Sequence, residues 1–586
     1  MVDKSVMDQG VGRRAVVVGL GALATSPLYG CAATPRPGSI RPGDAGWPSE
    51  ADWQRLNQAV GGRLAPVVLP SLPPDAAQKL FANPIYLGEQ AGLTQMSGWV
   101  DAWTSAPSAY VVRSSSAADV SAAVRFARER GVRLVVKGGG HSYTGGSNAP
   151  DSLLVWTRDM DWIELHDGFT PQACVGPPVS AVSVGAGCIW GRVYDEVTTR
   201  HGRYVQGGGC TTVGVAGLIQ GGGFGSFSKG FGIAAASLLE AEIVTADGEI
   251  RIVNACQEPD LFWALKGGGG GTFGVVTRLT LKTHDLPQTF GSVNWSIKAK
   301  SDDAYRRLLG RFIDTFASNL FNAHWGEQAR AMQDNRLIIQ MMFQGLDEAE
   351  ARGAWRELEV FVGSAPHDYE IADPLRANVI PPRNLWDKTF LSLAAPNAIS
   401  SDDRPGARPR DFWWKGDGEQ AAAMWHGYDS AWLPASLLAP VERATLADAW
   451  FAASRLWTVS FHFNKGMAGA ETQTIAASRE TSMNPQVLDA FALAIIASEG
   501  PSSYPVFPAP DLTEPRRRAG RIRASMQALR QAAPDAGSYL SECDYFMRDW
   551  GNSSWGAHLP KLERIKRQYD PDGLFAVHHG IGSGTT

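Results

Sequence analysis

The sequence predicts an α+β protein whose first half combines strands, helices and glycine-rich loops, and whose character changes after about residue 288. Residues 110–112 and 134–136 are short apolar runs, and residues 115–131 between them carry apolar side chains at helical spacing. Glycine runs follow the second of these strands. Beyond residue 288, a strand over residues 337–343 alternates with long helical runs over residues 302–319 and 347–362. These patterns predict an α/β region followed by a second region of strands and long helices.

Length and composition agree with a large ligand-binding protein. A chain of 586 residues is too long for one ordinary domain, and 44% hydrophobic residues supply a sizeable core. The net charge of −5 gives no basic footprint, so no nucleic-acid partner is expected. The 64 glycines and 20 tryptophans favour loops that approach a ligand closely and surfaces suited to planar or sugar-like molecules.

The N-terminus is typical of an export signal. Arg13 and Arg14 precede an apolar run over residues 15–24, which is too short to span a membrane. We therefore expect a signal peptide over residues 1–33 and an exported, periplasmic or extracytoplasmic protein. The paired arginines resemble a twin-arginine signal, with an ordinary secretory signal as the alternative. Residues 28–31 also resemble a lipoprotein cleavage box, in which Cys31 would carry a lipid anchor. Residues 34–74, rich in Pro and Gly at first, are expected to be a linker and lead-in.

The cysteines indicate no metal site. None of the six forms a CxxC pair or has the spacing of a zinc site. In an exported protein, Cys174 and Cys188 are candidates for a disulfide.

Two glycine-rich segments carry reactive side chains. The first runs from Lys137 through three glycines to His141, and the second follows three glycines with Cys210. Glycine runs let backbone N–H groups approach a ligand, because no Cβ intervenes and positive φ costs little. Taken singly, each segment could be a turn beside an ordinary His or a buried Cys. Together they are suited to cradling a diphosphate and bonding covalently to the attached ring system.

A third glycine run does not indicate a dinucleotide-binding Rossmann loop. Gly269, Gly271 and Gly274 match GxGxxG, but a strand over residues 275–281 is predicted to follow. A Rossmann loop opens a helix instead.

The two reactive loops resemble the flavin domain of berberine-bridge-enzyme-like members of the vanillyl-alcohol-oxidase (PCMH-type) FAD oxidoreductases. The segment LFWALKGGGGGTFGVVT at residues 261–277 and YDPDGLF at residues 569–575 resemble the same family. The resemblance implies a PCMH-type FAD-binding domain of two α/β subdomains over residues 75–287. It further implies an antiparallel-sheet substrate domain backed by helices over residues 288–505, and a C-terminal segment over residues 506–586 that returns to the flavin domain.

The same resemblance implies FAD bound covalently at two points. His141 would bond to the 8α-methyl carbon of the flavin and Cys210 to C6. The residues expected to contact the cofactor are Lys137, Gly138, Gly139, Gly140, His141, Ser142, Gly145, Gly146, Cys210, Thr212, Val213, Gly214, Gly217, Gly221, Gly222, Gly223, Gly225 and His579.

The expected reaction is hydride transfer to the flavin, helped by a protein base. The resemblance makes Tyr539 the first candidate for this base, although the Asn of the family's YxN motif is replaced by Ser541. A phenol must lose roughly three pKa units to act near neutral pH, and Lys465 is the candidate cation that would lower its pKa. Glu542 and His579 are alternative bases. Tyr539 could also be a buried tyrosine bonded to the backbone.

The electron acceptor and the substrate are less narrowly defined. In plant members of the family, the residue three positions after the cysteine gates dioxygen, and a valine there admits it. Val213 at this position favours an oxidase that releases hydrogen peroxide. A dehydrogenase with another acceptor and a non-catalytic flavin-binding protein are the alternatives. The substrate would be a small alcohol, sugar or aromatic molecule, with part of the aromatic cluster at residues 412–414 lining its pocket.

Overall fold

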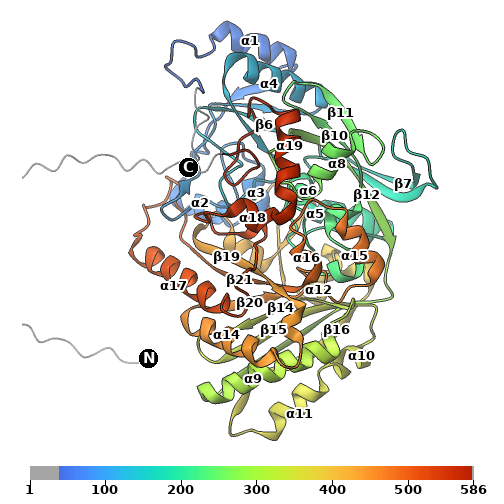
Figure 1. The fold of residues 1–586 in the computed structure, drawn as a ribbon. Helices are drawn as coiled ribbons and strands as arrows, with labels where there is room; N and C mark the ends of the chain where they lie inside the picture. The colour runs from blue at the N-terminus through green and yellow to red at the C-terminus, as the bar shows by residue number, and fades with distance from the viewer. Residues whose placement is uncertain (1–38, 584–586) are drawn as a thin grey trace, which may run out of the picture.

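The computed structural model describes residues 39–583. The described chain forms two sheets within residues 39–287, here called the flavin-type half, a nine-stranded sheet built mainly from residues 288–505, and a two-stranded sheet of β17 (Ile399–Ser401) and β18 (Phe412–Trp414). Helices α1 (Glu50–Ala59) and α19 (Leu559–Tyr569), from near the two ends of the described chain, both lie in the upper half of Figure 1. The predicted signal peptide, the arginine pair and Cys31 lie outside the described residues. Within residues 39–583, no helix is long and apolar enough to cross a membrane.

The first sheet is the predicted strand–helix–strand unit. β4 (Tyr110–Arg113), β6 (Ser152–Trp156) and β5 (Arg133–Lys137) pair in parallel, and β1 (Leu64–Pro66) adds antiparallel to β4. Helix α4 (Ala117–Arg130) connects β4 to β5, as parallel pairing requires. Its ends are encoded locally: Ser116 and Asp119 form a capping box, and Gly131 stops the helix with φ of 65°. Helix α1 (Glu50–Ala59) packs on α4.

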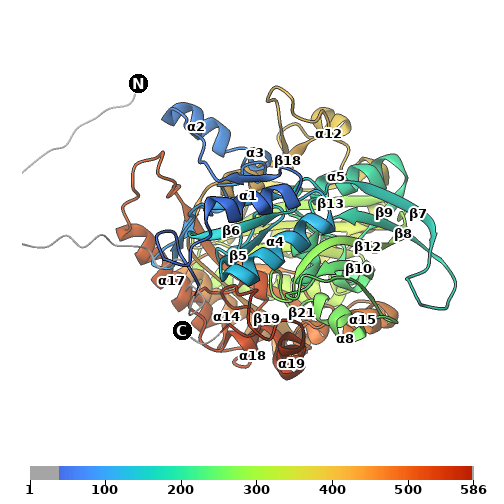
Figure 2. The same cartoon turned by 90° about the horizontal axis from the view of Figure 1, so that it is seen from above.

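The second sheet is antiparallel throughout. Its order is β11-β10-β12-β8-β7, with β9 (Arg203–Val205) also paired to β12, and β7 lies at the outer edge in both views (Figures 1 and 2). The strands are β7 (Ile163–Phe169), β8 (Val179–Gly185), β10 (Leu238–Val244), β11 (Ile250–Asn254) and β12 (Val275–Asp285). The predicted hairpin through residues 246–248 is confirmed. A strand, not a helix, follows Gly274. This confirms the prediction that the third glycine run is not a Rossmann loop.

The nine-stranded sheet has the order β16-β13-β15-β14-β20-β21-β19-β2-β3. Its strands are β13 (Phe290–Ala299), β14 (Trp325–Ala331), β15 (Arg336–Gln344), β16 (Tyr369–Ile380), β19 (Met424–Pro434), β20 (Val459–His462), β21 (Ala490–Gly500), β2 (Gly98–Trp99) and β3 (Trp103–Thr104). Every pairing is antiparallel except that of β19 with β2. The predicted α+β fold with an antiparallel sheet is therefore confirmed. The sheet also recruits β2 and β3 from the flavin-type half, which pair the open edge of β19.

Helices cover one face of this sheet. α9 (Asp302–Thr315) and α14 (Arg443–Leu456) lie below it in Figure 1, with α11 (Arg356–Ser364) beyond them, α10 (Glu348–Gly353) at the lower right and α17 (Thr513–Leu529) at the left. Strand β13 shows the division: Val293 and Trp295 are buried in the core shared with these helices, whereas Ser292 and Asn294 point to the other face. Alternation along the strand thus gives the sheet one apolar face and one polar face.

The end of the C-terminal segment packs on the flavin-type half, whereas its first helix, α17, packs on the nine-stranded sheet. Helix α19 (Leu559–Tyr569) packs against α8 (Pro259–Leu265), and the two lie side by side in Figure 1. After α19, the buried carboxylate of Asp570 accepts hydrogen bonds from the backbone N–H groups of Leu574 (2.7 Å) and Phe575 (2.8 Å). This turn directs residues 577–580 toward the central cavity.

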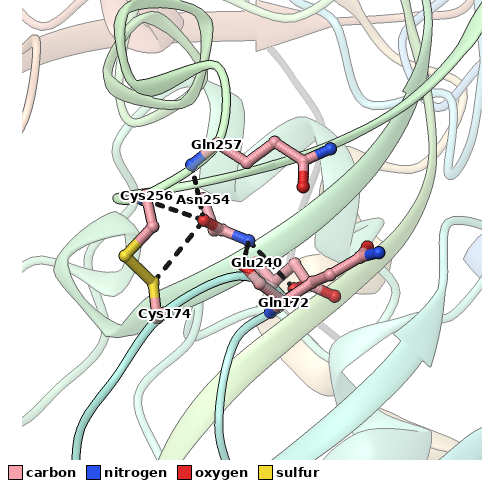
Figure 3. Close-up of a disulfide and its surroundings, with 6 residues drawn as sticks. All are labelled: Gln172, Cys174, Glu240, Asn254, Cys256 and Gln257. Atoms are coloured by element: carbon pink, nitrogen blue, oxygen red, sulfur yellow. Dashed lines mark hydrogen bonds between the residues drawn. A yellow bond between two sulfur atoms is a disulfide. The ribbon is translucent and has the colours of Figure 1, made fainter.

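The disulfide differs from the expected one. Cys174 pairs with Cys256, across 82 residues (Figure 3). Cys188 is a free cysteine, buried in the core. Asn254 holds the two segments together: its side-chain oxygen accepts from the N–H of Cys256, and its amide donates to the carbonyl of Gln172. The expectation was wrong because tertiary pairing, not sequence proximity, brings the end of β11 beside the loop after β7.

Candidate active site

A cavity of about 1130 Å³ lies between the flavin-type half and the polar face of the nine-stranded sheet. Glycine loops after β5 and before α6 (Val215–Gln220) form part of its wall, and strands β13, β14, β15 and β20 form another. Residues 577–580 complete it from the C-terminal segment. The three parts of the chain that resembled one family therefore meet at one site.

The loop after β5 is pressed against the loop after Cys210. A Cβ placed on Gly139 would lie 2.7 Å from the backbone nitrogen of Gly214, and Gly140 has φ of +78°. Glycine is therefore required at both positions, for a close approach and for a left-handed backbone. Lys137, by contrast, points away from the cavity and donates to the carbonyls of Gln90 (3.1 Å) and Leu93 (2.9 Å). Its place is structural, which corrects the expectation that it contacts the cofactor.

His141 lies on the cavity wall in a form suited to act as a nucleophile. Its Nε2 is 3.1 Å from the hydroxyl oxygen of Thr212. Burial lowers the pKa of His141 to about 4, so the imidazole is neutral near pH 7. With Nε2 engaged by Thr212, Nδ1 is the nitrogen left to form another bond.

Cys210 faces the same cavity from a loop that is held from two sides. A Cβ on Gly207 would lie 2.2 Å from the ring of Trp190, so the loop rests directly on that indole. On the other side, Thr211 donates to the carbonyl of Phe412 (2.9 Å). The thiol itself lies 3.2 Å from Oδ1 of Asp417. Burial, and then the Asp417 carboxylate, raise the pKa of Cys210 well above its ordinary value.

The candidate bases lie together, but not in the expected arrangement. Lys465 Nζ donates to both carboxylate oxygens of Glu542, each at 2.6 Å. The Tyr539 hydroxyl accepts the N–H of Gly223 at 3.2 Å, and burial followed by the negative charge of Glu542 raises its pKa. The expected lowering of the Tyr539 pKa by Lys465 is therefore not found, because the ammonium group is bound to Glu542.

His579 also reaches the cavity wall. It stacks on Trp550 with ring centroids 5.5 Å apart, and its Nδ1 is 3.7 Å from the sulfur of Cys543. Burial lowers the pKa of His579 to about 3, with the neighbouring His578 adding to the effect. A base this weak is poorly suited to remove a proton from an alcohol.

Of the predicted cofactor residues, eleven line the cavity and seven do not. Those that line it are Gly138, Gly139, Gly140, His141, Ser142, Gly146, Cys210, Val213, Gly214, Gly217 and His579. Those that do not are Lys137, Gly145, Thr212, Gly221, Gly222, Gly223 and Gly225. Thr212 and Gly223 nevertheless contact His141 and Tyr539, and Gly145 packs on the Trp103 ring. Of the aromatic cluster at residues 412–414, only Trp414 lines the cavity.

Several cavity residues were not predicted. The ring centroids of Tyr143 and Tyr428 lie 5.3 Å apart. Tyr143 could have been predicted from the sequence, because it directly follows His141 and Ser142. Glu327 accepts from the Ser226 hydroxyl at 2.6 Å, and burial raises its pKa. Neither Glu327 nor Asp417 belongs to a motif, so the sequence carries no signal for them.

The cavity suits an FAD molecule. Within residues 39–583, six buried polar atoms of its lining residues have no hydrogen-bond partner: Gln220 Oε1, Thr272 Oγ1, Arg330 Nε, Asp417 Oδ2, Trp425 Nε1 and Asn464 Oδ1. Buried polar groups are normally satisfied, so these atoms favour a polar ligand. A Cβ on Gly209 or Gly217 would meet no atom of the described residues within 4 Å, so the backbone there is open to such a ligand. His141 and Cys210 place two nucleophilic side chains on the wall of this cavity.

Comparison with known proteins identifies the family. A family profile described as "FAD binding domain" matches residues 107–254, and one described as "Berberine and berberine like" matches residues 535–582. The FAD-linked oxidoreductase easE of Trichophyton verrucosum is 30% identical over 590 residues, which is 93% of this chain and 90% of that protein. The chain therefore belongs to the FAD-linked oxidoreductases of the vanillyl-alcohol-oxidase type with a berberine-like C-terminal segment, and is an FAD-dependent oxidoreductase.

Solved structures share the fold. The VAO-type flavoprotein MtVAO615 from Myceliophthora thermophila C1 superposes with a TM-score of 0.75 at 24% identity, covering 93% of this chain and 97% of that one. Glucooligosaccharide oxidase from Acremonium strictum, which carries a 6-S-cysteinyl, 8α-N1-histidyl FAD, gives a TM-score of 0.61 at 19% identity. That match covers 82% of this chain and 93% of the oxidase.

Proposed function

We propose that the protein is an exported oxidase that holds FAD through both His141 and Cys210. It oxidises a C–H bond next to an alcohol or amine and passes the electrons to dioxygen, giving hydrogen peroxide. The proposal rests on one observation: the two nucleophiles, His141 and Cys210, line the same cavity. His141 contacts Thr212, which belongs to the loop that carries Cys210. When bound, FAD supplies the hydride acceptor, so the chain has to position the ring and the substrate and to move a proton.

Glu542 is the base that the geometry favours. Its carboxylate faces the cavity and is held at both oxygens by Lys465, which fixes its direction. Tyr539 would have to ionise against burial and against the charge of Glu542. We therefore assign proton removal to Glu542 and orientation to Lys465, with Tyr539 as a neutral contact.

The exchange Glu542→Gln keeps the shape of the side chain but removes its basicity. It should lower kcat by about 10²–10⁴-fold, the usual contribution of a general base, while Tyr539→Phe should cost much less. Steady-state kinetics of both variants with the same substrate decide between them. A larger loss in Tyr539→Phe would return the role of base to the phenol.

The polar face of the sheet favours a hydroxyl-bearing substrate. Asn294, Gln340, Gln328 and His462 are successive cross-strand partners and form one row on the cavity side. Burial lowers the pKa of His462 well below its ordinary value, so the row is uncharged. Amide and imidazole groups both donate and accept hydrogen bonds, which matches the hydroxyl groups of a sugar or a polyphenol.

Dioxygen as the acceptor is supported by Val213. This side chain lines the cavity, and its backbone carbonyl is fixed by the N–H of Trp190 at 3.1 Å. With its backbone held in this way, the Val213 side-chain volume would limit the space open to dioxygen when FAD is bound. Export is supported by the Cys174–Cys256 disulfide, because such bonds persist in oxidising compartments.

One set of measurements tests the tethers and the chemistry. The purified protein should be yellow and keep its flavin in acid, and His141→Ala and Cys210→Ala should each keep one bond while the double variant releases it. Complete release from His141→Ala alone would exclude the cysteine bond. Anaerobic bleaching should then be screened with sugars, phenolic alcohols and amines without hydroxyl groups. Bleaching by the last group only would contradict the proposed preference for a hydroxyl-bearing substrate.

A further inference from the structure

We propose that Asp417 is the catalytic base for the attachment of FAD to Cys210. It accepts the thiol proton as the sulfur bonds to the flavin ring. This inference rests on the proposed function, because it concerns how one of the two tethers is made.

The Asp417 carboxylate contacts the Cys210 thiol directly through one oxygen, and its second oxygen is free to accept another hydrogen bond. Oδ1 of Asp417 accepts the S–H of Cys210 at 3.2 Å. Oδ2 is buried and has no hydrogen-bond partner within residues 39–583. A buried carboxylate oxygen without a partner is costly, so its retention needs a reason. Asp417 lines the same cavity as the thiol, where a proton acceptor is required.

The segment that carries Asp417 is fastened to the cysteine loop. Two hydrogen bonds connect strand β18 (Phe412–Trp414) to this loop. The Thr211 hydroxyl donates to the carbonyl of Phe412 (2.9 Å), and the Trp414 indole N–H donates to the carbonyl of Gly209 (3.1 Å). Helix α13 (Lys415–Gln420) follows at once and presents Asp417. Contacts on both sides of Cys210 therefore fix the carboxylate relative to the sulfur, as a base requires.

The electrostatics explain why a base is needed. Burial, and then Asp417, keep the pKa of the Cys210 thiol well above its ordinary value, so the sulfur does not ionise by itself near pH 7. Burial raises the pKa of Asp417 to about 6, which makes it a stronger base than an ordinary carboxylate. The charged groups that also act on the pair are Glu327, Lys465 and Glu542, and of these only the Lys465 ammonium favours the thiolate. The backbone N–H of Thr211 partly offsets the effect of burial by lowering the pKa of Asp417.

The attachment balances in atoms and electrons. The S–H and C6–H bonds break and one S–C6 bond forms. Two electrons and two protons enter the ring, and Asp417 relays the thiol proton. Dioxygen, the acceptor of the proposed function, then takes both electrons and both protons and leaves as hydrogen peroxide. His141 differs because its neutral imidazole already presents a nitrogen lone pair. Loss of Asp417 should therefore affect the cysteine bond selectively.

The test measures bond formation, not turnover. Full-length protein made under riboflavin starvation is mixed with FAD in air, and both flavin-bearing peptides are quantified by mass spectrometry over time. In Asp417→Asn, the Cys210 bond should form about 100-fold more slowly, while the His141 bond forms at the wild-type rate. Asp403→Asn, which changes an exposed carboxylate between β17 (Ile399–Ser401) and β18, is the control and should behave as wild type. In the wild type, the Cys210 rate should fall as pH drops through about 6.

The outcomes separate the two proposals. A selective loss of the cysteine bond supports the inference. Normal rates for both bonds in Asp417→Asn overturn it, and so does equal loss of both, which would place Asp417 in the architecture of the site. A wild-type protein that never forms the Cys210 bond would instead overturn the proposed double attachment itself.

Discussion

The contact between the two reactive loops makes Gly139→Ala an informative perturbation. The glycine has no left-handed backbone, so alanine tests space alone. Its added Cβ would lie 2.7 Å from the nitrogen of Gly214 and 3.1 Å from the carbonyl oxygen of Thr212. Both neighbours are backbone atoms, and an ordinary contact begins at 3.4 Å, so the loops must separate by up to 0.7 Å.

The expected cost follows from this separation. Overpacking a close-packed site costs about 1–3 kcal/mol, and we expect a loss of this size in the free energy of unfolding. The effect on flavin attachment should be larger, because a displacement of about 1 Å can slow a positioned reaction by roughly 100-fold. Moving Gly214 also moves Thr212, the partner of His141, so the histidine bond should slow with the cysteine bond.

Urea unfolding and the time course of both flavin-bearing peptides measure these effects. Gly138→Ala is the matched control in the same loop, because its Cβ would meet nothing nearer than the Ala186 carbonyl oxygen at 3.3 Å. It should lose much less stability. If Gly139→Ala unfolds at the wild-type urea concentration and attaches flavin at the wild-type rate, the close approach of the loops does not govern tether formation, and the reasoning is refuted.

Three further predictions concern the acceptor, export and the disulfide. Val213→Leu should slow reoxidation of the reduced flavin by dioxygen in stopped flow, because a larger side chain fills a close-packed site. An unchanged reoxidation rate would show that Val213 does not control the access of dioxygen. Replacing Arg13 and Arg14 with Lys should retain flavin-bearing protein in the cytoplasm on cell fractionation, whereas continued export would indicate the general secretory route. Cys174→Ser opens a loop of 82 residues and should destabilise the protein by about 4 kcal/mol in denaturant unfolding under oxidising conditions. Cys188→Ser, which breaks no disulfide, should lack this dependence on oxidation.

The sequence predicted those features that are encoded locally. Helix α4 could be placed because its apolar spacing, capping box and Gly131 lie within one short segment. The hairpin of β10 and β11 and the strand after Gly274 follow from similarly local patterns. The two glycine loops were recognised because a nucleophile follows each run directly.

Features that depend on tertiary pairing were missed. Lys465 meets Glu542 across 77 residues, and Cys210 meets Asp417 across 207, so no spacing in the sequence links either pair. The same limit explains the disulfide: Cys188 is nearer to Cys174 in sequence, but the end of β11 brings Cys256 beside it. Lys137 matched the expected motif, yet its ammonium group satisfies backbone carbonyls behind the loop.

The site is assembled from segments that meet only in the complete fold. The histidine loop contacts the cysteine loop through Gly139 and Gly214, and the cysteine loop is fastened to residues 412–417 of the second region. The flavin-type half alone would hold both nucleophiles but not Asp417. It should therefore form the histidine bond without the cysteine bond. Flavin bound at both residues would therefore show that the two regions have packed together. This agrees with the proposal that the protein folds before it leaves the cytoplasm.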